Sequence, residues 1–195
     1  GTYFIAFDKN RKQFLRLNLY GNPAYFGTQY SVEGAEIFNP LNVGMDLIKL
    51  IQLNNADCYA FMRNGAEGKL YELKFNVKFT GPFTFSAQQK REFKRPELIT
   101  ADTKWQGAKN GVIYIASAGK VFRYNPINEE FRELATNFGG TAITMLKLSE
   151  DEETLLVGNE GTIWFTSIKT GDNGLLIKKI EDIPGNPVDM AIRTN

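Results

Sequence analysis

The feature that most constrains this chain is the recurrence of one strand-and-turn pattern. Short runs of aromatic and β-branched residues alternate with turns rich in Asn, Asp and Gly along most of the 195 residues. Asn, Asp and Gly provide the positive-φ or side-chain-capped positions that tight hairpins need. Residues 140–181 show the pattern most clearly, with expected strands at 143–148, 154–158, 162–168 and 175–180. The pattern predicts an all-β chain built from repeated antiparallel units.

The same unit recurs earlier in the chain. Residues 98–135 repeat the four strands, and residues 44–85 repeat them again with a last strand near 79–85. Units of about 40–55 residues with four strands are typical of β-propeller blades. The best helical pattern, Ser86 to Phe93, is short and polar and has no apolar stripe.

The two ends of the chain predict how the array would close. Residues 188–193 resemble a first strand with nothing after it, and residues 2–7 resemble a second strand with nothing before it. Joined with residues 2–42 they would complete one blade and remove the exposed sheet edges. We therefore expect residues 1–195 to form one four-bladed β-propeller closed by its C-terminal strand. Because residues 20–42 break the strand pattern, a fragment of a larger propeller and a β-sandwich stay open as alternatives.

Composition excludes several functions. The chain has no histidine and one cysteine, which excludes Ser-His-Asp and Cys-His catalysis and thiolate or histidine zinc sites. With 23 basic and 22 acidic side chains, the balanced charge argues against nucleic acid as a partner. No apolar run approaches the roughly 20 residues that span a membrane. The single cysteine, Cys58, lies in an apolar run and is expected to be a buried structural thiol.

Three expected first strands carry an aspartate at the same register, as Asp46, Asp102 and Asp189. The first strands of a propeller line its central channel. These carboxylates could therefore ring the axis, raise one another's pKa values and bind a cation such as Ca²⁺. The alternative is that each caps its own loop or pairs with a nearby cation such as Lys147.

A second candidate site is a cluster of aromatic residues in the irregular segment 20–42. Aromatic side chains outside regular strands can stack against a sugar or a peptide. They can equally pack the loop onto a blade or plug the mouth of the channel. The cluster consists of Tyr20, Tyr25, Phe26, Tyr30 and Phe38.

A basic stretch with interleaved aromatic residues covers residues 79–95. Such a pattern can bind single-stranded nucleic acid. The charge is local, however, and we expect a solvated outer strand and linker there.

Two hairpins carry a family resemblance. Two segments have sequences typical of propeller hairpins. They are residues 110–126, from Asn110-Gly-Val-Ile-Tyr to Tyr-Asn125-Pro, and residues 155–164, which end in Gly-Thr-Ile-Trp164. Together they resemble the C-terminal propeller-like region of PKD-like family lipoproteins from Bacteroidetes, over residues 98–195. The resemblance implies an exported protein of the periplasm or cell surface, of a kind often found beside glycan-uptake systems. It carries over no functional residue, and the missing Trp-Asp and Gly-His pairs argue against a WD-repeat protein.

These observations predict a non-catalytic binding module of an exported protein that recognises a glycan or a protein partner. We expect no cofactor apart from the cation that the aspartates could hold. One alternative is a carboxylate-dependent glycoside hydrolase or lyase working from one face, which needs two carboxyl groups roughly 5–10 Å apart. The other alternative is a structural scaffold without a ligand.

Overall fold

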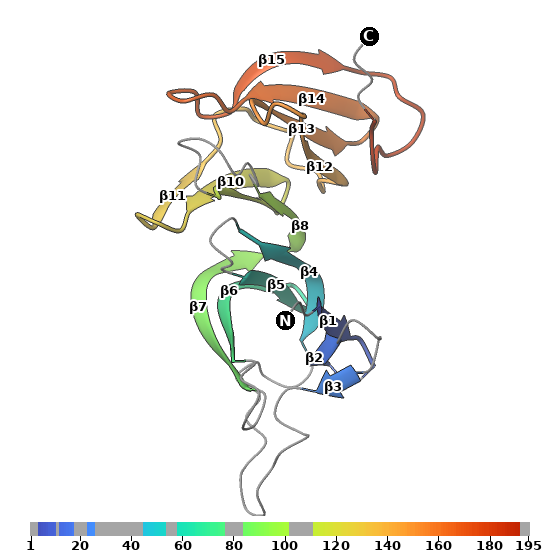
Figure 1. Ribbon diagram of the computed structural model, residues 1–195. Coiled ribbons are helices and arrows are strands. Elements are labelled where there is room, and N and C mark those ends of the chain that lie inside the picture. The colour runs from blue at the N-terminus through green and yellow to red at the C-terminus, as the bar shows by residue number, and fades with distance from the viewer. Residues whose placement is uncertain are drawn as a thin grey trace, which may run out of the picture.

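Four antiparallel sheets make up the described part of the protein (Figure 1). The computed structural model describes residues 4–10, 12–17, 23–25, 45–53, 58–76, 84–101 and 111–191. Within these residues every regular element is a strand, so the all-β prediction is confirmed. In each sheet the strands follow one another in chain order, as a meander.

The first sheet consists of β1 (Phe4–Asp8), β2 (Gln13–Leu17) and β3 (Pro23–Tyr25). The second consists of β4 (Asp46–Gln52), β5 (Cys58–Asn64), β6 (Glu67–Asn76) and β7 (Thr84–Lys94). The third consists of β8 (Pro96–Ala101), β9 (Ile113–Ser117), β10 (Lys120–Asn125) and β11 (Glu130–Glu133). The fourth consists of β12 (Met145–Leu148), β13 (Thr154–Asn159), β14 (Thr162–Ser167) and β15 (Leu175–Ile180).

The sheets pack face to face in chain order, and the second strand of a sheet is buried on both sides. In β9, Ile113 and Ile115 face the second sheet while Tyr114 and Ala116 face the fourth. Alternate side chains of a strand point to opposite faces, so a strand between two packed sheets reads as a continuous apolar run. This explains the continuous buried apolar runs of β5 and β9, and β13 carries one too because Ile183 and Met190 cover its outer side.

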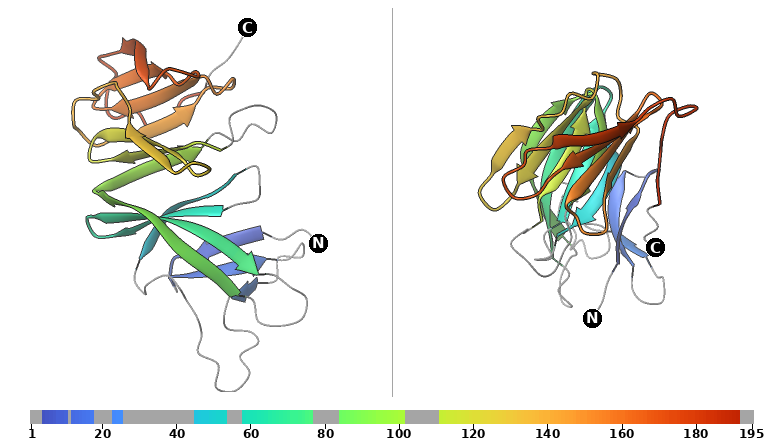
Figure 2. Two further views of the ribbon diagram at one scale, coloured as in Figure 1. Left: turned by 90° about the vertical axis from the view of Figure 1, so that its left-hand side faces the viewer. Right: turned by 90° about the horizontal axis from the view of Figure 1, so that it is seen from above.

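The array is open rather than closed. Figure 1 and the left view of Figure 2 show the sheets following one another from β1–β3 to β12–β15, with the N-terminus beside β1 and the C-terminus beside β15. The predicted closure by residues 188–193 is not formed, because described residues 188–191 belong to no strand. They are held at the last sheet instead, where Thr144 Oγ1 donates a hydrogen bond to the Pro187 carbonyl at 2.6 Å. An ion pair of 2.7 Å between Lys147 and Asp189 adds to this.

The fourth strand of the second sheet lies later in the chain than the sequence pattern indicates. That strand was expected near 79–85, whereas β7 covers Thr84–Lys94. Its sequence, with Gln, Lys, Arg and Glu in a row, has little strand propensity. It is a strand because it pairs along the whole length of β6.

In the second, third and fourth sheets, the hairpin between the second and third strands contacts the segment that follows the fourth strand. Gly119 has φ +74°, and a Cβ on it would lie 2.3 Å from the backbone of Gly140. In the second sheet, the Arg95 amide donates to the Ala66 carbonyl at 2.6 Å. In the fourth, the Ile183 amide donates to the Gly161 carbonyl at 2.9 Å. The same junction therefore recurs after three successive sheets.

Candidate functional site

Two of the three predicted aspartates are each paired with a lysine. Asp46, at the start of β4, forms an ion pair with Lys12, and Asp189 pairs with Lys147 at 2.7 Å. The hydrogen bond from the lysine is the main cause that lowers the pKa of each carboxyl group. Asp102 lies outside the described residues.

Mutual repulsion in a carboxylate ring would raise these pKa values, whereas both are lowered. Asp46 and Asp189 are also 49% and 76% exposed, as expected for surface ion pairs. Among the described residues, no three acidic or cysteine side chains gather where they could hold a metal ion. The geometry of Asp46 and Asp189 therefore agrees with the alternative of local pairing, and a site that includes Asp102 stays a prediction.

The predicted aromatic platform falls almost entirely outside the described residues. Tyr20, Phe26, Tyr30 and Phe38 lie there. Tyr25 is the last residue of β3, paired in register with Leu15 of β2. The platform also stays a prediction.

The structure places a different polar surface on the outer half of the second sheet. We call it the charged ladder: the charged side chains that β6 and β7 bring together across their register. Lys69 lies opposite Glu92 and forms an ion pair with it at 3.5 Å, and Glu67 lies opposite Lys94. Opposite charges directly across an antiparallel pair stabilise the pairing. The ladder therefore keeps a polar strand such as β7 in place.

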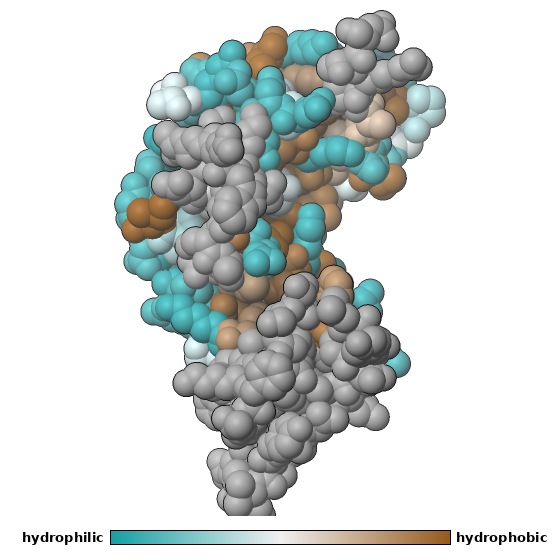
Figure 3. Space-filling view, viewed as in Figure 1, coloured by the Kyte–Doolittle hydropathy of each residue, from teal (hydrophilic) through white to brown (hydrophobic). Residues whose placement is uncertain are grey.

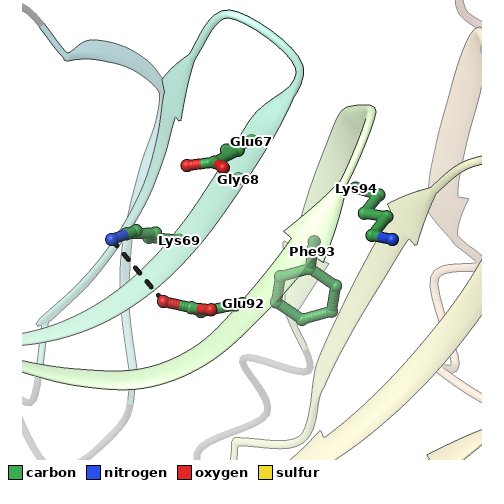
Figure 4. A pocket seen from close by; sticks show the side chains of 6 residues that line it. All are labelled: Glu67, Gly68, Lys69, Glu92, Phe93 and Lys94. Atoms are coloured by element: carbon green, nitrogen blue, oxygen red, sulfur yellow. Dashed lines mark ion pairs between the residues drawn. The ribbon is translucent and has the colours of Figure 1, made fainter.

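A hollow of about 200 Å³ lies at one end of the charged ladder (Figure 4). It is lined by two acidic and two basic side chains and by Phe93, and an ion pair joins Lys69 to Glu92. Gly68 forms part of the wall, where a Cβ would lie 2.5 Å from the Cβ of Pro96. Glycine at this position allows β8 to begin close against β6.

The other end of the charged ladder lies on the opposite face of the second sheet, toward the third sheet, and is more buried. Lys90 lies 3.1 Å from Glu72 and 3.3 Å from Glu129, and the Lys90 and Glu72 side chains are only 13% and 12% exposed. Although burial lowers the pKa of Lys90, its hydrogen bonds to the two glutamates raise it overall. A second hollow of about 140 Å³ begins at this pair and is lined by Glu72, Lys74, Ser86, Ala87 and Gln88.

An unsatisfied hydroxyl group lies beneath this end of the ladder. The hydroxyl group of Tyr124 in β10 is buried and finds no hydrogen-bond partner in the part of the chain that the structure describes, and burial raises its pKa. The guanidinium group of Arg91 lies 5.2 Å from the centre of the Tyr124 ring and donates to the Glu129 carbonyl at 2.9 Å. Arg91 and Lys90 thus join the second sheet to the third.

One carboxyl group joins the third sheet to the fourth. Glu97 of β8 accepts the amide of Gly119 through one oxygen and the amide of Ile143 through the other, both at 3.0 Å. Burial raises the pKa of Glu97, and the two amides partly oppose this shift. We call this arrangement the Glu97 bridge.

Sequence reasoning expected residues 79–95 to be a solvated outer strand and did not predict the ladder. The signal was present in the charged residues of β6, of which Glu67 and Lys69 lie opposite Lys94 and Glu92 of a second charged stretch. The ladder could be recognised only from the register in which β6 pairs with β7. The number of residues between the two strands does not determine that register.

Comparison with known proteins supports the fold alone. No family model matches the sequence, and no curated protein does. A protein from Lactobacillus plantarum, solved as a target of the Northeast Structural Genomics Consortium, has a similar structure with a TM-score of 0.53 and 14% sequence identity. The match covers 92% of this chain and 53% of that one, so this chain spans about half the length of its structural neighbour.

In the described part of the chain, no helix is long and apolar enough to cross a membrane.

Proposed function

We propose that this chain is a non-catalytic binding module and that its charged ladder binds a glycan. The proposal includes a finer description of the fold, in which the four sheets are consecutive blades of a β-propeller. Three features support that description: the meander order within each sheet, the face-to-face packing, and the first strand β8, which contacts the first strands β4 and β12 on either side. First strands that adjoin one another around an axis are typical of propellers.

The observation that carries the glycan proposal is the pair of hollows along the ladder, whose charged β6 side chains lie on opposite faces of the second sheet. Both are lined by carboxylates and ammonium groups side by side. Carboxylates only accept hydrogen bonds and ammonium groups only donate them. A ligand with many hydroxyl groups, each able to donate and accept, can satisfy both kinds of group. A polyanion would meet repulsion from Glu67, Glu72 and Glu92.

Binding fits these carboxylates better than acid–base catalysis. A glycoside hydrolase needs one carboxyl group with a raised pKa that can reach the leaving group. Glu97 has a raised pKa, but both of its oxygens are occupied by backbone amides. Glu72 and Glu92 are engaged in ion pairs with lysines. The carboxylate-dependent enzyme therefore ranks second, and the scaffold without a ligand ranks third.

The proposal also includes where in the cell the protein acts. We place the module in an exported protein of the periplasm or cell surface, on the strength of the resemblance of residues 98–195 to PKD-like family lipoproteins. A module that binds glycans would have its ligands at hand there.

A glycan array followed by calorimetry tests the proposal. We expect a neutral or weakly acidic oligosaccharide to bind, and Glu92→Gln to weaken that binding at least tenfold because it removes an acceptor from the larger hollow. Glu153→Gln is the matched control, because Glu153 forms a comparable exposed ion pair with Lys169 at 3.2 Å on the fourth sheet. Equal binding by the two variants, or no glycan retained on the array, would refute the proposal.

A further inference from the structure

The outer strand of the fourth sheet is an exposed apolar edge. Among the described residues β15 is paired with β14 alone, and all six residues of β15 are exposed. Leu175, Leu176, Ile177 and Ile180 are 54%, 47%, 55% and 43% exposed. In Figure 3 hydrophobic atoms interrupt the hydrophilic surface at the top of the molecule, over β15.

The other outer strands of the four-stranded sheets differ. Three of the four residues of β11 are charged, and the exposed described residues of β7 are all polar. Natural sheets protect their edges with such residues, because the free amide and carbonyl groups of an edge strand pair readily with another strand. β15 therefore departs from the pattern that the same chain follows elsewhere.

The two lysines of β15 do not protect it in the usual way. The Lys178 ammonium group lies 4.6 Å from the centre of the Phe165 ring, and that of Lys179 lies 5.5 Å from the centre of the Trp164 ring. Both rings belong to β14, so the lysines fold back over the sheet. Both ammonium groups make cation–π contacts, and that of Lys179 also forms an ion pair of 2.6 Å with Glu181. Among the described residues, no other strand pairs with the outer edge of β15.

We propose that β15 pairs with β15 of a second copy of this chain, antiparallel and across a twofold axis, so that two four-stranded sheets join into one. The sequence of the strand favours this occupant. With Leu175 opposite the second copy's Ile180, each lysine lies opposite an apolar residue, and no two lysines face each other directly. Parallel pairing in register would set Lys178 and Lys179 against their own copies, which is unfavourable.

The twofold arrangement is also closed. Each copy uses the same strand in the same way, so the contact is self-complementary and ends at two chains. Six residues a side make a contact smaller than a standard interface of about 1,200–2,000 Å². We therefore expect a weak dimer that dissociates at micromolar concentrations. This inference is independent of the proposed glycan binding, because the charged ladder lies on a different sheet.

Sedimentation velocity over a wide concentration range tests the dimer. We expect the wild-type chain to pass from monomer to dimer, and Ile177→Lys to weaken the association at least tenfold by adding a charge to the edge. Ile127→Lys is the matched control, since Ile127 is 65% exposed in the turn between β10 and β11 and should dimerise normally.

Hydrogen exchange identifies the surface involved. A peptide covering residues 174–181 should exchange more slowly at high than at low protein concentration in the wild type, and at one rate in Ile177→Lys. A wild-type chain that stays monomeric up to millimolar concentration would overturn the proposal. So would a dimer that Ile177→Lys leaves intact, because its interface would then lie elsewhere.

Discussion

Removal of the Glu97 bridge should weaken the packing of the fourth sheet on the third. The Glu97 carboxylate accepts the amides of Gly119 and Ile143, each at 3.0 Å. Both donors lie in buried residues. In Glu97→Ala the two amides lose their acceptor.

The magnitude follows from these two bonds. A hydrogen bond to a charged group contributes about 1.5–3 kcal/mol. Loss of both would cost about 3–6 kcal/mol, but the substitution also removes a carboxylate that burial disfavours, as its raised pKa shows. We expect Glu97→Ala to lower the free energy of unfolding by about 2–3 kcal/mol, and Glu97→Gln by about 1 kcal/mol, because glutamine keeps one acceptor oxygen.

Equilibrium unfolding in urea, followed by tryptophan fluorescence, measures both values. Glu153→Ala is the control, since it removes an exposed ion pair and should change the free energy of unfolding by less than about 1 kcal/mol. If Glu97→Ala were no more destabilising than Glu153→Ala, the bridge would not contribute as we infer.

The pH dependence adds a second check. Burial raises the pKa of Glu97 above its ordinary value of 4.5, so the folded chain holds this proton more tightly than the unfolded chain does. The contribution of Glu97 to stability is therefore greatest below pH 4.5 and declines as the pH rises through the raised pKa. Because glutamine does not titrate, the gap in stability between the wild type and Glu97→Gln should narrow from about pH 4 to about pH 7. A widening gap would show that the pKa is lowered instead.

Three further predictions concern stability and can be checked by the same urea titration. Gly119→Ala should cost more than about 2 kcal/mol, because the added Cβ meets facing backbone, whereas Gly139→Ala, also at positive φ but with open space around it, should cost about 1 kcal/mol. Tyr124→Phe should leave the free energy of unfolding unchanged or raise it by up to about 1 kcal/mol, because the hydroxyl group that it removes is buried without a partner. Lys90→Met should cost about 1–3 kcal/mol by leaving Glu72 poorly compensated, and adding Glu72→Gln to that variant should recover part of the loss.

The repeat could be predicted from the sequence because a strand that is buried on both faces is a continuous apolar run. A continuous apolar run such as Val112–Ala116 occurs where a strand lies between two packed sheets, and Leu155–Val157 occurs where the strand is covered by the third sheet on one side and by Ile183 and Met190 on the other. Turn residues then separate these runs into units of regular length. Both signals are local, so they appear without knowledge of the three-dimensional arrangement.

The closure of the sheets and the charged ladder both depend on contacts between residues far apart in the sequence. The sequence predicted these two features less well than the repeat. A strand-like run at residues 188–191 cannot show which sheet it will join, and Thr144 and Lys147 hold it at the fourth. Asp46 begins β4 whereas Asp189 belongs to no strand, so their predicted shared register is not formed. Their lysine partners lie 34 and 42 positions away. The charged ladder likewise exists only once β7 is paired with β6.

The way in which the sheets share their cores has a consequence for how this protein unfolds. The first three apolar clusters each join a sheet to the next one along the chain, and the fourth cluster lies on the outer side of the last sheet. When each sheet is stabilised mainly by its contacts with the neighbouring sheets, the chain behaves as a row of coupled units. Loss of the first sheet should therefore remove one partner from the second and leave the fourth almost untouched. Under tension such a molecule would give way from its ends, one sheet at a time, instead of in a single cooperative step.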